Sequence, residues 1–75
     1  MKDFTKEIEV ERARARAKYG NHNEKSMMEW RHVFTKQLGD MTIILENGGP
    51  KARFRREVIQ LAAATMEALE NSAAW

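Results

Sequence analysis

The sequence predicts an all-α protein, in which an antiparallel helical hairpin follows an N-terminal helix and the helices complete a bundle when copies associate. Two observations predict this fold. Apolar residues recur every three or four positions along extended segments, which is the spacing of one face of an α-helix. The breaks between these segments are rich in glycine and asparagine, and no segment has the pattern of a strand. We therefore expect residues 1–75 to form one small helical domain.

The first helix is expected from Asp3 to about Lys18, a stretch without proline or glycine. Its apolar residues recur near the helical repeat, with charged residues between them: Phe4, Ile8, Ala15 and Tyr19. The arginines and the lysine of "ERARARAK" fall on two different sides of this helix. This pattern predicts a charged outer face and not a single basic stripe that binds nucleic acid. The segment "YGNHNEKS" ends this helix, because its glycine and asparagines tolerate turn conformations.

The second helix begins at a capping box, in which Ser26 and Glu29 satisfy each other's backbone donors. One apolar stripe follows it: Met27, Trp30, Val33, Phe34, Leu38, Met41, Ile44 and Leu45. The segment "NGGP" ends it, and Pro50 suits the first turn of the next helix.

The third helix is expected from about Lys51 to Asn71. Its stripe comprises Phe54, Val58, Leu61, Ala62, Thr65, Met66 and Leu69. Because the turn before it is short, the second and third helices should form an antiparallel hairpin.

Composition limits the partners. A chain of 75 residues buries only about 60% of its unfolded surface, and it has no cysteine for disulfides or thiolate metal sites. We therefore expect a homodimer or homotetramer, with Trp30, Phe34, Leu38 and Trp75 at the interface. The formal charge of +2 is too small to predict nucleic-acid binding. No apolar run is long enough to span a bilayer, which predicts a cytoplasmic protein without a membrane segment.

Three oxygen-bearing residues suggest a metal site on the hairpin. Asp40 lies late in the second helix and Glu57 early in the third, so the hairpin brings them to comparable heights. Gln60, one turn beyond Glu57, adds a carbonyl oxygen of the kind that Mg²⁺ accepts beside substrate phosphates. The alternative is ordinary surface pairing within each helix: Asp40 with Lys36, and Glu57 with Arg53 or Arg56.

The segment "KARFRR" places four cations around the start of the third helix: Lys51, Arg53, Arg55 and Arg56. They suit phosphate binding together with the helix N-terminus, and they oppose the helix dipole, so helix stability alone does not favour them there. The alternative is a solvated helical turn.

From about Glu11 to Glu70 the sequence resembles the short, phage-type MazG-like members of the all-α nucleoside triphosphate pyrophosphohydrolase superfamily. The resemblance rests on three segments in this order: "ERARARAKYG", "EWRHVFTKQLGDM" and "RREVIQLAAATMEALE". In that family, E-E-x-x-E and E-x-x-D patterns hold Mg²⁺ for attack of water on a nucleoside triphosphate. Here "KQLGD" and "EVIQ" stand at those patterns, so Asp40 and Glu57 are the carboxylates that remain. Gly39 fits as the small residue often found before the last acid of the first pattern.

The resemblance implies a nucleotide-binding protein whose pyrophosphohydrolase activity is weak or absent. Lys36 and Gln37 replace two motif glutamates and Gln60 replaces the last acid, which predicts weak Mg²⁺ binding and assigns no residue as catalytic. Lys36 would instead contact a phosphate, together with the basic segment. The competing hypothesis is a non-catalytic protein-interaction module on the same scaffold.

Overall fold

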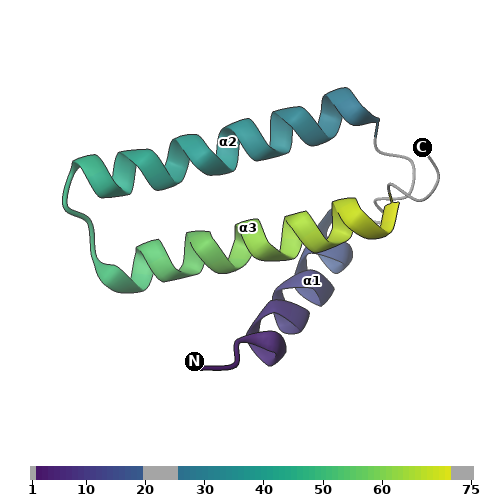
Figure 1. Cartoon of the computed structure of the whole chain (residues 1–75), viewed down its shortest axis with the longest axis horizontal. Helices are drawn as coiled ribbons and strands as arrows, with labels where there is room; N and C mark the ends of the chain where they lie inside the picture. The colour runs from purple at the N-terminus through teal and green to yellow at the C-terminus, as the bar shows by residue number, and fades with distance from the viewer. Residues whose placement is uncertain (1, 20–25, 72–75) are drawn as a thin grey trace.

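The computed structural model describes residues 2–19 and 26–71, which form three helices. They are α1 (Thr5–Tyr19), α2 (Met27–Glu46) and α3 (Lys51–Asn71). Figure 1 shows α2 and α3 lying side by side and antiparallel, with α1 crossing beneath α3. The predicted all-α fold, with a hairpin and an N-terminal helix, is confirmed. None of the described helices is both long and apolar enough to cross a bilayer.

Local hydrogen bonds explain where the first two helices begin. The predicted capping box is present: Ser26 Oγ accepts from the Glu29 backbone N–H, and the Glu29 carboxylate accepts from the Ser26 N–H. At α1, the Asp3 carboxylate accepts from the N–H of Thr5 at 2.9 Å. The helix therefore begins at Thr5, two residues after the predicted start, because Asp3 supplies an acceptor from outside it.

The turn between α2 and α3 uses both glycines of "NGGP". Gly48 has a φ of 64°, in the left-handed region that favours glycine. The N–H of Gly49 donates to the Ile44 carbonyl at 2.9 Å, and a Cβ at Gly49 would lie 2.9 Å from Ile44 Cγ2. The Pro50 carbonyl then accepts from the N–H groups of Arg53 and Phe54, which starts α3 directly.

The buried apolar core of the described residues is small and consists of Trp30, Ile44 and Ala63. The rings of Trp30 and Phe34 stack with centroids 5.9 Å apart. On α3 the buried positions are Ala63, Glu67 and Asn71, whereas Val58, Met66 and Leu69 of the predicted stripe are exposed. The side of α3 that the single chain buries is therefore not the side of the predicted stripe. The reason is that α1 packs against a different side of α3, the one that carries Glu67.

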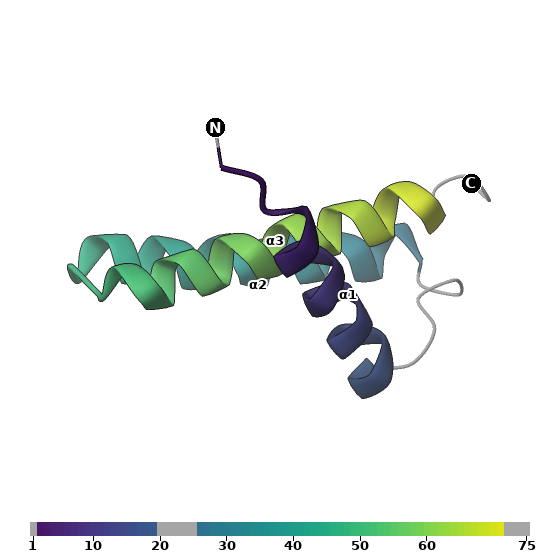
Figure 2. The same cartoon turned by 90° about the horizontal axis from the view of Figure 1, so that it is seen from below.

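Figure 2 shows α1 crossing the hairpin at a steep angle instead of running along it. α3 contacts both of the other helices. The Cα radius of gyration is 13.1 Å, compared with about 11 Å for a typical compact chain of this length. The chain is therefore more extended than its size requires. Only one face of the hairpin is covered by α1 (Figure 2).

Candidate functional site

An ion cluster fixes α1 on α3. Arg12 Nε donates to Glu67 Oε1 at 2.7 Å, and Arg16 Nη2 lies 2.7 Å from the same oxygen. Arg12 Nη2 also lies 2.5 Å from the exposed Glu70. The Arg12 and Glu67 side chains are each only 6% exposed, so this pair is shielded from water. The predicted charged outer face of α1 is therefore wrong at Arg12, which points inward.

The cluster also sets the charge state of its members. Burial by itself raises the pKa of Glu67, but the hydrogen bonds and charges of Arg16 and Arg12 outweigh it and hold the pKa below its ordinary value. The hydrogen bonds that Arg12 donates to Glu70 and Glu67 raise the pKa of its guanidinium. Both groups are thus charged at neutral pH, and each neutralises the other.

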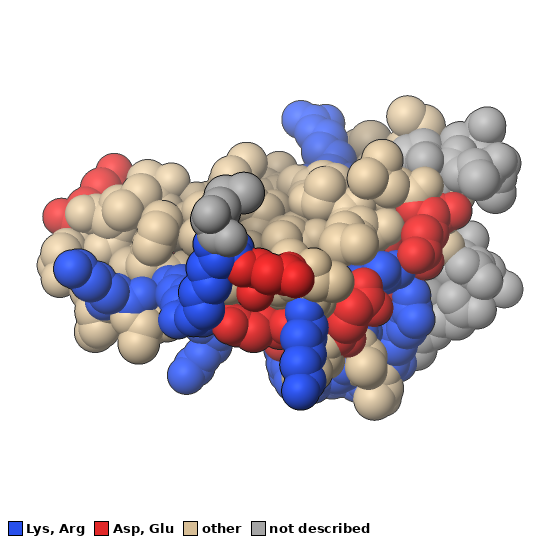
Figure 3. All heavy atoms as spheres, turned by 60° about the horizontal axis from the view of Figure 1, so that its bottom comes forward, with Lys and Arg blue, Asp and Glu red and all other residues tan. Residues whose placement is uncertain are grey.

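Beside this cluster, a groove of about 520 Å³ opens between all three helices, and we call it the three-helix groove. Figure 3 looks onto the side of the molecule that carries α1, where acidic and basic side chains lie next to one another. The groove is lined by side chains from each helix: Glu11, Arg14, Ala15 and Lys18 of α1; Trp30, His32, Val33, Lys36 and Gln37 of α2; Gln60, Ala63, Ala64 and Glu67 of α3.

The three-helix groove carries side chains that can bind an anion. Lys36 offers an exposed ammonium group, and Gln37 and Gln60 offer amides. Gln37 Oε1 is buried and has no hydrogen-bond partner among the described residues. The two acids of the groove are already paired, Glu67 with arginines and Glu11 with Arg14 at 2.6 Å.

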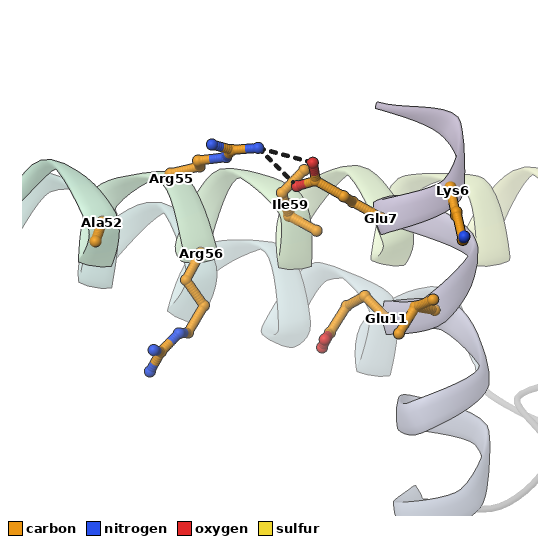
Figure 4. Close-up of a pocket in the computed structure, with 8 residues that line it drawn as sticks. Lys6, Glu7, Glu11, Ala52, Arg55, Arg56 and Ile59 are labelled. Carbon is orange, nitrogen blue, oxygen red and sulfur yellow. Dashed lines mark hydrogen bonds and ion pairs between the residues drawn. The ribbon is translucent and has the colours of Figure 1, made fainter. Parts of the chain in front are cut away.

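A second groove lies between α1 and α3 alone, with a volume of about 450 Å³. Figure 4 shows Lys6, Glu7 and Glu11 on its α1 side and Arg55 and Arg56 on its α3 side. Arg55 Nη2 donates to both carboxylate oxygens of Glu7, at 2.7 and 3.0 Å, and its guanidinium also lies over the Phe4 ring. Arg55 is therefore engaged in holding α1 to α3.

The predicted metal ligands are divided between two places. Gln60 lines the three-helix groove, whereas Asp40 and Glu57 line neither groove. Asp40 lies six residues before the end of α2 and Glu57 six residues after the start of α3, so both lie about 9 Å along the helix axis from the turn. Both are half-buried. Within residues 2–19 and 26–71, no group of three or more His, Cys, Asp or Glu side chains is placed to hold a metal ion.

The predicted phosphate contacts are also separated. Lys36 lines the three-helix groove and Arg55 and Arg56 line the α1–α3 groove, whereas Lys51 and Arg53 are exposed and line neither. The structure therefore brings together Lys36 and Gln60, but it does not place the basic segment with them.

The predicted interface residues differ in exposure. Trp30 is 3% exposed and belongs to the core of the single chain, Phe34 is half-buried, and Leu38 is 53% exposed. Trp75 lies outside the described residues.

The chain matches no family model, no curated protein and no solved structure. The MazG-like resemblance consequently stays a prediction from the motif positions.

The sequence reasoning missed the Arg12–Glu67 pair, which joins residues 55 positions apart. One signal for it was present in "LAAATMEALE", where a charged Glu67 stands among small residues that allow a neighbouring helix to approach closely. Ala63, one turn before Glu67, is only 2% exposed.

Proposed function

We propose that this protein binds a nucleotide in the three-helix groove and hydrolyses it slowly or not at all. The observation that carries the proposal is that Lys36 and Gln60, from two different helices, line one groove. A lysine ammonium suits a phosphate, and an amide suits the edge of a base or a sugar hydroxyl. The MazG-like motif positions support the same assignment, since Lys36 and Gln60 both fall within them.

Slow or absent hydrolysis follows from the charge of the motif. Mg²⁺ catalysis of phosphoryl chemistry needs oxygen ligands that hold the metal against the phosphates. Asp40 and Glu57, at matching heights on the two helices of the hairpin, would supply two carboxylates. Lys36 adds a positive charge to the same motif, which weakens Mg²⁺ binding and favours direct contact between lysine and phosphate.

Isothermal titration calorimetry with ATP and with GTP tests the proposal, with and without Mg²⁺. We expect binding that persists without the metal. A hydrogen bond to a charged group contributes about 1.5–3 kcal/mol, so Lys36→Ala should weaken binding about ten- to hundredfold. Arg53→Ala, an exposed cation in neither groove, is the matched control and should leave the affinity unchanged.

Two outcomes contradict the proposal. If Arg53→Ala weakens binding and Lys36→Ala does not, the basic segment is the phosphate site and the groove is not. If neither nucleotide binds under any condition, the nucleotide proposal fails.

The second candidate function is a non-catalytic protein-interaction module. The observation that favours it is the exposure of large apolar side chains on the hairpin, among them Leu38 and Leu45, which are 53% and 64% exposed. Preservation of the fold in Asp40→Ala and Glu57→Ala, together with an absence of nucleotide binding in the unsubstituted chain, would support this candidate.

A further inference from the structure

His32 and Lys36 share the α2 wall of the three-helix groove. Both residues line it, and they lie four positions apart on the same helix. Residues at this spacing are neighbours on one side of a helix, with Cβ atoms about 5–6 Å apart. Both side chains are exposed, so each can turn toward a ligand in the groove. A phosphate that contacts Lys36 therefore lies within reach of the His32 imidazole.

The other walls of the groove add positive charge and leave no unpaired carboxylate beside His32. Arg14 and Lys18 line the groove from α1, also four positions apart. Glu11 of α1 accepts two hydrogen bonds from Arg14, at 2.9 and 2.6 Å, and Glu67 of α3 is paired with two arginines of α1. Cations thus outnumber acids among the lining residues, and both of the lining acids already have arginine partners.

The acid nearest to His32 along α2 is also engaged. Glu29 lies three residues earlier, and its carboxylate accepts from the backbone N–H of Ser26 in the capping box. No carboxylate that the structure places on these three walls is therefore left to take the role of a phosphate.

We infer that His32 is a second phosphate contact in the three-helix groove and makes nucleotide binding tighten as the pH falls. The inference rests on the proposed function, because it concerns the same groove and the same ligand. A histidine side chain gains its proton at about pH 6.5, and only the protonated ring carries a charge and donates from both nitrogens. A negative charge within about 4–6 Å favours the protonated ring. Nucleotide and proton therefore each strengthen the binding of the other.

The size of the effect follows from this linkage. An opposite charge stabilises a charged group by about one to three pH units, and the lower value suits an exposed residue such as His32. One unit corresponds to at most a tenfold change in affinity, so binding should tighten about five- to tenfold between about pH 8 and about pH 5.5. A phosphate group also titrates at about pH 6, so the effect is measured as the affinity ratio between the unsubstituted chain and a variant without the histidine.

Isothermal titration calorimetry with ATP in the presence of EDTA tests the inference on the full chain at both pH values. His32→Gln keeps a polar side chain that does not titrate, and His32→Lys fixes a positive charge at the same position. Arg31→Gln is the matched control, since Arg31 is the exposed neighbouring cation and lines neither groove. Circular dichroism of every variant at both pH values monitors the helix content.

We expect the affinity of the unsubstituted chain, relative to that of His32→Gln, to rise about five- to tenfold from about pH 8 to about pH 5.5. His32→Lys should bind more tightly than the unsubstituted chain at about pH 8, by a similar factor. Arg31→Gln should keep both the affinity and the pH profile of the unsubstituted chain.

Three results overturn the inference. If binding depends on Lys36 but His32→Gln has the pH profile of the unsubstituted chain, His32 is no phosphate contact and the proposed function still stands. If Arg31→Gln removes the pH dependence as His32→Gln does, the effect belongs to the general charge of α2 and not to the groove. If ATP binds at neither pH, the proposed function fails together with this inference.

Discussion

The buried pair of Arg12 and Glu67 gives the sharpest stability prediction. Glu67→Ala removes the carboxylate that accepts from Arg12 and lies beside Arg16, and it leaves the Arg12 charge in a site that is only 6% exposed. Removing one partner of a buried pair costs about 3–5 kcal/mol. Because Arg12 keeps Glu70 at 2.5 Å and Glu9 at 3.0 Å, we expect the lower end, about 3 kcal/mol.

Urea unfolding followed by circular dichroism measures this loss, at one fixed protein concentration because self-association would add to stability. In thermal unfolding the same loss corresponds to a Tm lowered by about 12 °C or more. Glu70→Ala is the matched control, since Glu70 pairs with the same arginines but its side chain is 59% exposed, and it should cost at most about 1 kcal/mol. The reasoning is refuted if Glu67→Ala costs no more than Glu70→Ala.

Three further predictions follow from single positions. Because folding lowers the pKa of Glu67, its ionised carboxylate stabilises the folded chain. This stabilisation is complete above the ordinary glutamate pKa of about 4.3, and it is lost as the pH falls through the lowered pKa of the folded state. Tm should therefore fall between about pH 5 and pH 3, and it should fall less steeply in Glu67→Gln. An equal acid slope in the variant would contradict this. Ser26→Ala removes the capping box and should cost about 1 kcal/mol in urea unfolding, and an unchanged midpoint would count against the role of the cap. Gly39→Ala should stabilise the folded chain by about 0.5–1 kcal/mol, because a Cβ there meets nothing within 4 Å. Gly48→Ala should destabilise it by about 1 kcal/mol or more, because Gly48 has a positive φ. The opposite order of the two effects would refute the assignment of the turn.

The helices and the turn could be predicted because their determinants are local. The capping box needs only Ser26 and Glu29, three residues apart, and the turn needs only the two glycines before Pro50. Periodicity found the apolar sides of α2 and α3 as well. It could not show which of those sides the single chain buries, since that depends on where α1 packs.

The packing of α1 was missed because it rests on charges far apart in the sequence. Arg12 resembles the exposed arginines around it, and only its contact with Glu67 distinguishes it. For the same reason Lys36 was predicted to contact phosphate together with the basic segment. In the structure Lys36 lines the three-helix groove, whereas Arg55 and Arg56 of that segment line the α1–α3 groove. Within the predicted site, Lys36 and Gln60 line one groove. This part of the site could be predicted, because the two motif positions lie on the two helices of an antiparallel hairpin.

Phosphorus-31 NMR of a nucleoside triphosphate mixed with the chain tests the central claim in one sample, because it reports binding and cleavage together. We expect the phosphate resonances to shift or broaden on adding the protein, without Mg²⁺ and with it, and we expect no product resonances to grow afterwards. Lys36→Ala should restore the spectrum of the free nucleotide. Unshifted, sharp resonances with the unsubstituted chain would contradict binding. Growing monophosphate and pyrophosphate resonances would contradict the absence of hydrolysis. If Asp40→Ala and Glu57→Ala abolish that growth, the two remaining carboxylates are sufficient for catalysis.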